Sequence, residues 1–327
     1  MTAHLPSTRL SNDSVKLLRY IAVIGGANMD ISAQTSVALA TADSTAGHIH
    51  CFPGGVARNV AENLARLGHI TRLVSAVGED VFGRHLLDAT RAAGVDVTAF
   101  SVLPSQRTAS YLSLHGPDGD MAVAVNDMAL FECLTPEVLR NFTGVFDAAA
   151  CTVVDCNLTP VALEWLMAHA SMTTFFADGV SVVKCKRIAP WLGRIHTLKI
   201  NRLEAQALSG QTAMSAPEAC LAAAYLHQLG VLNVVVSLGE QGVCWCDAQG
   251  VTGHRPARRV SVVNTTGAGD ALLAGLVHAF VRGMPLSQSV EFAMACAELT
   301  LASKFANDPL LSVTTVQKLL SASSLQF

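Results

Sequence analysis

The 327-residue sequence has few charged and few aromatic residues, which make up 14% and 6% of the chain. Its 22 Lys and Arg against 25 Asp and Glu leave a formal net charge of only −3. A chain this close to neutral has no strong electrostatic attraction for nucleic acid. The low charge therefore argues against a nucleic-acid partner and favours a small-molecule ligand.

Long apolar runs are also missing, since no segment reaches the roughly 18 uninterrupted apolar residues that a membrane helix needs. The most hydrophobic stretch, residues 271–281, is short and contains His278. Residues 1–19 have no apolar block typical of a secretory signal, and we interpret them as a disordered leader. These absences predict a cytoplasmic protein that does not contact a membrane.

Paired cysteine spacings are the third absence. The nine cysteines are an odd number, and the closest pair, Cys244 and Cys246, flanks Trp245 in a strand-like run. Neither a disulfide framework nor a zinc motif fits this spacing. We therefore expect reduced cysteines that are mostly buried.

The sequence does contain 51% hydrophobic residues, arranged as short β-rich runs that alternate with longer amphipathic segments. Residues 234–236 are three consecutive valines, which indicates a strand buried on both faces. Alternation of this kind predicts an α/β fold with a doubly wound, mostly parallel sheet. The expected strands are 21–25, 71–77, 151–155, 173–178, 197–200, 233–237 and 260–263.

Two segments interrupt this alternation. Residues from about 106 to 127 contain two alternating runs around Pro117, Asp118 and Gly119, which is turn chemistry and predicts an antiparallel hairpin. Residues 31–52 look like strands that no helix follows at once. We expect both segments to form a small β lid inserted into a single domain that spans residues 20–327.

The strongest local signal is NTTGAGD at 264–270, between an expected strand and an apolar helix. Its glycines allow backbone N–H groups to converge at the positive end of the helix dipole, which suits an anion that develops during a reaction. Asp270 in the first helical turn can accept a proton from an attacking hydroxyl. Taken alone, Asp270 can equally be a helix cap.

A second signal is Gly54-Gly55, which opens an amphipathic helix with Asn59 about one turn in. The glycines allow close approach to the backbone, and Asn59 can bind a sugar hydroxyl. A tight turn followed by a surface Asn explains the same residues.

A third signal is Asn28 and Asp30, which come directly after the first strand, at the edge where open α/β sheets bind ligands. An Asx-turn is the simpler interpretation of these two residues.

Two further segments carry groups suited to phosphates. Asn201 and Glu204 are three apart at a helix start, near enough to act together on phosphate or hydrated Mg²⁺, with Lys199 beside them. A helix capping box explains Glu204 equally well. The loop from Ser237 through Gly239 to Gly242 follows a buried strand and suits nucleotide phosphates, but is weak evidence alone. Asn126 and Asp127, at the end of the lid hairpin, are candidates for reading a nucleobase or simply end a strand.

In this order along the chain, the motifs NxD at 28–30, GGxxxN at 54–59, NxxE at 201–204 and GAGD at 267–270 resemble those of the ribokinase (PfkB-type) family of sugar and nucleoside kinases. The resemblance runs from residue 20 to about 312. The strings FPGGVARN at 52–59, SAVGEDVFG at 75–83 and IHTLKINRLEA at 195–205 are similar to those of the pseudouridine-phosphorylating branch of that family. The family implies a ribokinase-like fold with a β lid.

The resemblance also implies roles for the residues already singled out. Asp270 corresponds to the catalytic base, and Gly267, Ala268 and Gly269 to the anion hole. Asp30, Gly54, Gly55 and Asn59 are the implied sugar ligands, and Asn28, Asn126 and Asp127 are the candidates for reading the base. ATP is implied at Lys199, Asn201, Ser237, Gly239, Gly242 and Thr266, with Mg²⁺ near Asn201 and Glu204.

The implied reaction transfers the γ-phosphoryl group of MgATP to the ribose 5′-hydroxyl of pseudouridine. A kinase for ribose or another nucleoside, and a kinase-like sensor without turnover, are the alternatives. Many relatives have Asp where Asn264 stands, at a position tied to a monovalent cation, which weakens the expectation of potassium activation. We also expect a homodimer formed through the lid.

Overall fold

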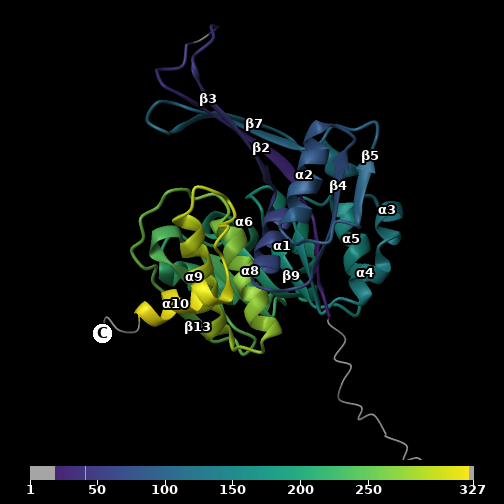
Figure 1. Cartoon of the computed structure of the whole chain (residues 1–327). Helices are drawn as coiled ribbons and strands as arrows, with labels where there is room; N and C mark the ends of the chain where they lie inside the picture. Colours follow the sequence, from purple (N-terminus) through teal and green to yellow (C-terminus); the bar gives the residue numbers. More distant parts are fainter. Residues whose placement is uncertain (1–18, 41, 324–327) are drawn as a thin grey trace, which may run out of the picture.

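The computed structural model describes residues 19–40 and 42–323 (Figure 1). The expected disordered leader, apart from Arg19, lies outside the described residues. Within those residues, no helix is both long and apolar enough to cross a membrane.

The body is built on a nine-stranded sheet. The strands from β11 to β5 are all parallel, whereas β12 and β13 are antiparallel and close one edge. This confirms the expected α/β fold with a mostly parallel sheet. In spatial order the strands are β13 (Thr252–Arg255), β12 (Val243–Cys246), β11 (Asn233–Ser237), β10 (Ile195–Asn201), β9 (Phe175–Asp178), β8 (Cys151–Asp155), β1 (Ile21–Ile24), β4 (Thr71–Gly78) and β5 (Phe100–Leu103).

Helices cover both faces of this sheet (Figure 1). Successive residues of a strand point to opposite faces, so Ile21 and Val23 pack into one core while Ala22 and Ile24 pack into the other. On the first face lie α1 (Val56–Arg66), α2 (Val81–Ala92), α8 (Ala268–Val281), α9 (Leu286–Leu301) and α10 (Val313–Ser323). On the second lie η1 (Ala129–Cys133), α3 (Pro136–Arg140), α4 (Thr143–Asp147), α5 (Pro160–His169), η2 (Lys184–Arg194), α6 (Arg202–Ser209) and α7 (Ala216–Gln228).

A second, four-stranded sheet projects from the body, as Figure 1 shows. It runs in the order β3 (Gly47–Gly54), β2 (Asn28–Thr35), β6 (Ser110–His115) and β7 (Met121–Asp127). The predicted hairpin is β6 and β7, and its turn closes where Gly116 N donates to Asp120 O at 2.9 Å. We call this second sheet the lid.

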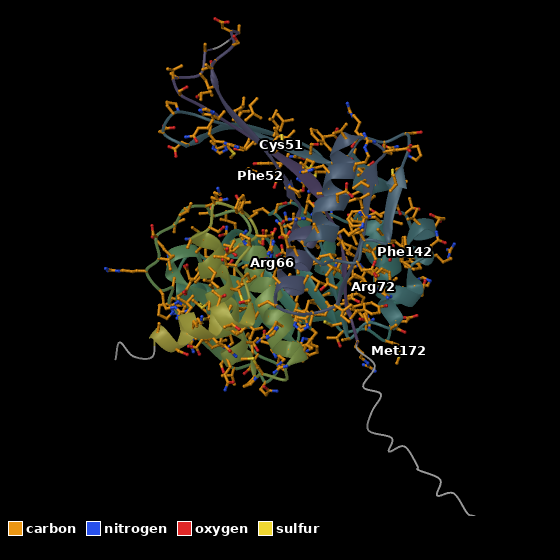
Figure 2. The ribbon with its side chains drawn as sticks, in the orientation of Figure 1. Cys51, Phe52, Arg66, Arg72, Phe142 and Met172 are labelled. Carbon is orange, nitrogen blue, oxygen red and sulfur yellow. The ribbon has the colours of Figure 1, made fainter. Side chains whose placement is uncertain are left out.

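The two faces of the lid differ in character. Asp30, Tyr111 and Asn126 are register partners across β2, β6 and β7, so they share one face. On the same face, at the foot of the lid (Figure 2), Phe52 meets Phe305 of the body edge-on, with ring centroids 6.1 Å apart. The opposite face is apolar and much of it is exposed. Its side chains are Ile31, Ala33, Ile49, Cys51, Leu112, Leu114, Val123 and Val125.

The strand expected at residues 260–263 is wrong. This segment is irregular, and Val262 and Val263 are 55% and 60% exposed. Val263 N donates to Leu301 O at 2.8 Å, so the segment bonds to the end of α9 instead of the sheet. The four-residue strands β5 and β13, which the hydrophobic pattern did not reveal, complete the two edges.

All nine cysteines lie within the described residues and are unpaired, and six of them are buried, so the prediction that most are buried is confirmed. Among the same residues no cluster of three or more His, Cys, Asp or Glu could hold a metal ion by itself.

Candidate active site

Polar side chains gather where the parallel strands of the body end and the lid begins. β1, β8, β9 and β10 all end at this edge because parallel strands share a direction, and the N-termini of α1 and α8 lie beside them. The structure brings together at this edge most of the residues that the sequence singled out, namely Asn28, Asp30, Gly54, Gly55, Asn59, Lys199, Asn201, Glu204, Gly267, Ala268, Gly269 and Asp270.

Asp155, at the end of β8, organises the entrance to α1. Its Oδ2 accepts hydrogen bonds from Gly26 N at 2.8 Å and Ala57 N at 3.0 Å, and its Oδ1 accepts one from Asn157 N at 2.8 Å. The side chain is 1% exposed, and burial raises its pKa while the hydrogen bonds from Gly26 and Asn157 lower it. Sequence reasoning gave Asp155 no role of its own. An Asp that ends an otherwise apolar buried strand was the available signal.

The double glycine Gly54-Gly55 is required by close packing within the protein. A Cβ on Gly54 would lie 2.0 Å from Asp30 Oδ2, and one on Gly55, whose φ is 99°, would lie 2.5 Å from Gly26 O. The glycines therefore let the Asp30 carboxylate and the β1–β2 connection approach the start of α1. Asn28 Nδ2 donates to Asp30 Oδ1 at 2.7 Å and orients that carboxylate toward the site.

Asp270 lies in the first turn of α8 and is 8% exposed. Its Oδ2 accepts a hydrogen bond of 2.8 Å from Asn59 Nδ2. Burial, followed by the negative charge of Asp178, raises the pKa of Asp270 to about 8, against the lowering effects of Lys199 and Asn59. A carboxyl group that titrates this close to neutral pH is suited to accept a proton during a reaction.

The turn before Asp270 depends on two glycines for different reasons. Gly267 has φ of 82°, and a Cβ there would lie 1.9 Å from Ala306 O. A Cβ on Gly269 would lie 2.6 Å from Lys199 Nζ, so the ammonium of this lysine rests against the turn. Lys199 Nζ also donates to Asp178 Oδ2 at 2.9 Å. The expected anion hole therefore has a fixed positive charge beside it, in addition to the helix N-terminus.

Asn201 and Glu204 form a complete capping box at the start of α6. Asn201 Oδ1 accepts from Glu204 N at 3.0 Å, while Asn201 N donates to Glu204 Oε2 at 2.9 Å. The capping interpretation is thus confirmed. Glu204 is 2% exposed, and burial followed by the charge of Asp178 raises its pKa.

The residues expected around ATP lie at the ends of β10 and β11 and before α8. Ser237 ends β11 as the register partner of Asn201, and Gly239 begins a 3₁₀ turn, η3 (Gly239–Gln241), with φ of 63°. Gly242 has φ of 93°, and a Cβ there would lie 2.0 Å from Arg255 O, so packing against the end of β13 explains this glycine. Thr266 is exposed.

Asn126 and Asp127 border a cavity of about 340 Å³ at the foot of the lid hairpin. Asn157 and Lys184 line it from the body, and Lys184 Nζ donates to Asn157 Oδ1 at 2.7 Å. Asn126 shares the lid face of Asp30, whereas the Asp127 carboxylate lies 3.3 Å from an Arg107 nitrogen. Sequence reasoning did not single out Lys184, because it lies in a segment without a recognisable motif.

Comparison with known proteins shows the family to which the chain belongs. Residues 18–312 match the model of the pfkB family of carbohydrate kinases. Pseudouridine kinase of Escherichia coli is 41% identical over 297 residues, which cover 91% of this chain and 95% of the relative. A second relative from the same organism is a sugar kinase whose substrate is not established. It is 39% identical over 90% of this chain and 81% of its own length.

Among solved structures, ribokinase of Arabidopsis thaliana, determined with ribose and ATP, superposes with a TM-score of 0.81 over 93% of this chain and 99% of its own. At 22% identity it shows a shared fold. With the family match and the two Escherichia coli relatives, the buried Asp270 and the glycine turn that precedes it complete the identification. The chain belongs to the PfkB family of carbohydrate kinases and is a phosphotransferase that acts on an alcohol group.

Proposed function

We propose that this protein phosphorylates the ribose 5′-hydroxyl of pseudouridine with MgATP, giving pseudouridine 5′-phosphate and ADP. The observation that carries the proposal is the buried Asp270 carboxylate, held by Asn59 at the N-terminus of α8 with the Lys199 ammonium against the same turn. A proton acceptor and a site for negative charge therefore lie within one helical turn. The similarity to Escherichia coli pseudouridine kinase supports the choice of acceptor.

In this mechanism the protein contributes position and electrostatics. Asp30 and Asn59 bind ribose hydroxyls and direct the 5′-hydroxyl at Asp270, which takes its proton as the oxygen attacks the γ-phosphorus. The backbone N–H groups of residues 267–269 stabilise the charge on the transferred group. The lid excludes water over the site, which limits hydrolysis of ATP.

ATP is proposed to bind along Ser237, Gly239, Gly242 and Thr266, with its phosphates toward Lys199 and Asn201. These residues lie at one edge of the sheet, where nucleotides bind in open α/β folds.

The negative charge at this edge of the sheet suits a bound Mg²⁺ ion. Asp155, Asp178, Glu204 and Asp270 are all buried there, and Asp178 raises the pKa of each of the other three. Mg²⁺ keeps several waters and uses few protein carboxylates, so Glu204, with Asn201 beside it, is a sufficient anchor despite its capping role. When bound, the ion neutralises charge on the phosphates.

The cavity beside Asn126 is the proposed base site. It is large enough for a uracil ring and combines the ammonium of Lys184 with the amide of Asn126 and the carboxylate of Asp127. Pseudouridine carries one more ring N–H than uridine, and a pocket with an acceptor for that donor discriminates strongly against an analogue that leaves the acceptor bare.

We therefore predict a kcat/KM for pseudouridine at least about tenfold above that for uridine, adenosine or ribose, the ratio expected for one unpaired buried polar group. The measurement is initial-rate ADP release with each acceptor. Asn126→Ala should narrow the ratio between pseudouridine and uridine. Gln34→Ala, on the same face of the lid but outside the cavity lining, is the matched control and should leave it unchanged.

An equal kcat/KM for uridine or ribose would refute pseudouridine as the preferred acceptor and favour the related sugar-kinase function. The assignment as a phosphotransferase would stand. Failure to release ADP with any acceptor in a single turnover would support a ligand sensor.

Potassium independence is a separate proposal. Asn264 Nδ2 donates to Lys304 O at 3.3 Å and Asn264 Oδ1 accepts from Thr266 N at 2.9 Å, so a neutral amide already joins the two loops beside Gly267. We expect equal rates in KCl, NaCl and tetramethylammonium chloride at one ionic strength. Asn264→Asp, which cannot donate to Lys304, should gain a cation requirement. A potassium-specific increase in the wild-type rate would contradict this proposal.

A homodimer through the lid is proposed from its exposed apolar face, where Ile49 and Val125 are 70% and 61% exposed. Two such faces covering one another would remove this surface from water. Sedimentation velocity should show a dimer for the wild type and a monomer for Ile49→Lys/Val125→Lys. Gln34→Lys, on the polar face, should remain dimeric. A monomeric wild type would refute the proposal.

The cytoplasmic location also stays a proposal, which the nine unpaired cysteines support.

A further inference from the structure

Arg58, in the first turn of α1, is a buried arginine with an unusually full set of partners. Its side chain is 6% exposed and forms an ion pair with Glu62. Its Nη1 lies 2.8 Å from Asn307 Oδ1, 3.1 Å from Asn59 Oδ1 and 3.3 Å from Pro53 O, and its Nε donates to Thr90 Oγ1 at 3.4 Å. A guanidinium only donates hydrogen bonds, so every group it contacts must present an acceptor.

This requirement determines how the Asn59 amide is oriented. Because Asn59 Oδ1 accepts from Arg58, Asn59 Nδ2 points the other way and donates to Asp270 Oδ2 at 2.8 Å. A flipped amide would place two donors together at Arg58 and two acceptors together at Asp270. The Arg58 guanidinium therefore selects the donor that faces Asp270.

Asn307 extends the same network to the far side of the site. Its Oδ1 accepts from Arg58, and its Nδ2 donates to Asn59 O and Asn63 Oδ1, both at 2.9 Å. The preceding residue, Ala306, provides the carbonyl against which Gly267 packs. Arg58 thus ties the helix that carries Asn59 to the loop behind the glycine turn.

Several other charges act on Asp270 from the elements around it. Asp178 on β9 and Asp155 on β8 disfavour its ionised form, while Lys199 on β10 favours it. On α1 the charge of Arg58 is offset by Glu62, so Arg58 reaches Asp270 chiefly through the Asn59 hydrogen bond.

We propose that Arg58 is a positioning residue for phosphoryl transfer: it holds the Asn59 amide as a donor to Asp270, which orients that carboxylate and favours its ionised form. The inference rests on the proposed role of Asp270 as base. It assigns Arg58 a function that none of the motifs predicted.

The test compares Arg58→Met with Arg66→Met. Arg66 bonds the same Glu62 at 2.6 Å from the next turn of α1 but makes no contact with Asn59, so it is the matched control (Figure 2 labels it). The titration of the Asp270 carboxyl is followed by infrared difference spectra between each protein and the same protein carrying Asp270→Asn. This readout needs no substrate, so it separates failure of this inference from failure of the proposed function.

Arg58→Met should raise the pKa of Asp270 by roughly one unit, the effect of losing one oriented donor. The acid limb of the kcat–pH profile with pseudouridine should move in the same direction, lowering kcat at pH 7 about tenfold while kcat recovers at high pH. Arg66→Met should match the wild type in both measurements. Unchanged titration in Arg58→Met, with kcat lowered equally at every pH, would reduce Arg58 to a structural role and overturn the proposal.

A second comparison guards against misfolding. Arg58→Met/Glu62→Met removes the buried pair together and avoids leaving Glu62 without its closest cation. Asn59→Ala should shift the Asp270 titration as Arg58→Met does, and Arg58→Met/Asn59→Ala should shift it no further, because Arg58 acts through Asn59. Additive shifts would show that Arg58 acts on Asp270 independently, contrary to the proposal.

Discussion

The proposed reaction depends on one constraint, which is that Asp270 must be ionised to accept a proton although water hardly reaches it. Burial and the neighbouring Asp178 both oppose ionisation and raise the pKa of Asp270 to about 8. Asn59 and Lys199 act in the other direction. A carboxyl group whose pKa is raised in this way binds and releases a proton near neutral pH, whereas a group at its ordinary pKa in water stays ionised there.

The fold supplies these opposing groups from separate elements. Asp178 and Lys199 end neighbouring parallel strands, so the topology places a negative and a positive charge side by side. Asn59 comes from α1, whose entrance is fixed by the Asp155 carboxylate and by Gly55. The lid adds a polar face over the same edge and exposes its apolar face on the other side. The proposed nucleoside site, the proposed anion site and the proposed dimer surface thus all adjoin one edge of the sheet.

Much of this arrangement could be predicted from the sequence, because it follows from local patterns. Consecutive valines on β11 indicated a buried parallel strand, the Pro117–Gly119 turn indicated a hairpin, and Asn201 with Glu204 indicated a helix cap. The expected strand at 260–263 failed because short apolar runs do not reveal what they pack against. The relation between Arg58 and Asn307 could not be predicted either, since these residues are 249 positions apart in the chain and share no motif. The motifs assign Gly54, Gly269 and Gly267 to ligand binding. Each is already required for packing within the protein, because a Cβ there would clash with Asp30, Lys199 and Ala306 respectively.

The most direct test of the central claim is the pair of kcat and nucleoside Kd values for Asp270→Asn. The amide keeps the size of the side chain but cannot accept the proton, so kcat should fall by roughly 10²- to 10⁴-fold, the range for a positioned general base. The Kd for pseudouridine, measured by calorimetry without ATP, and the Tm should stay close to those of the wild type. A variant that turns over at a near-normal rate would show that Asp270 is not the proton acceptor and would contradict the account.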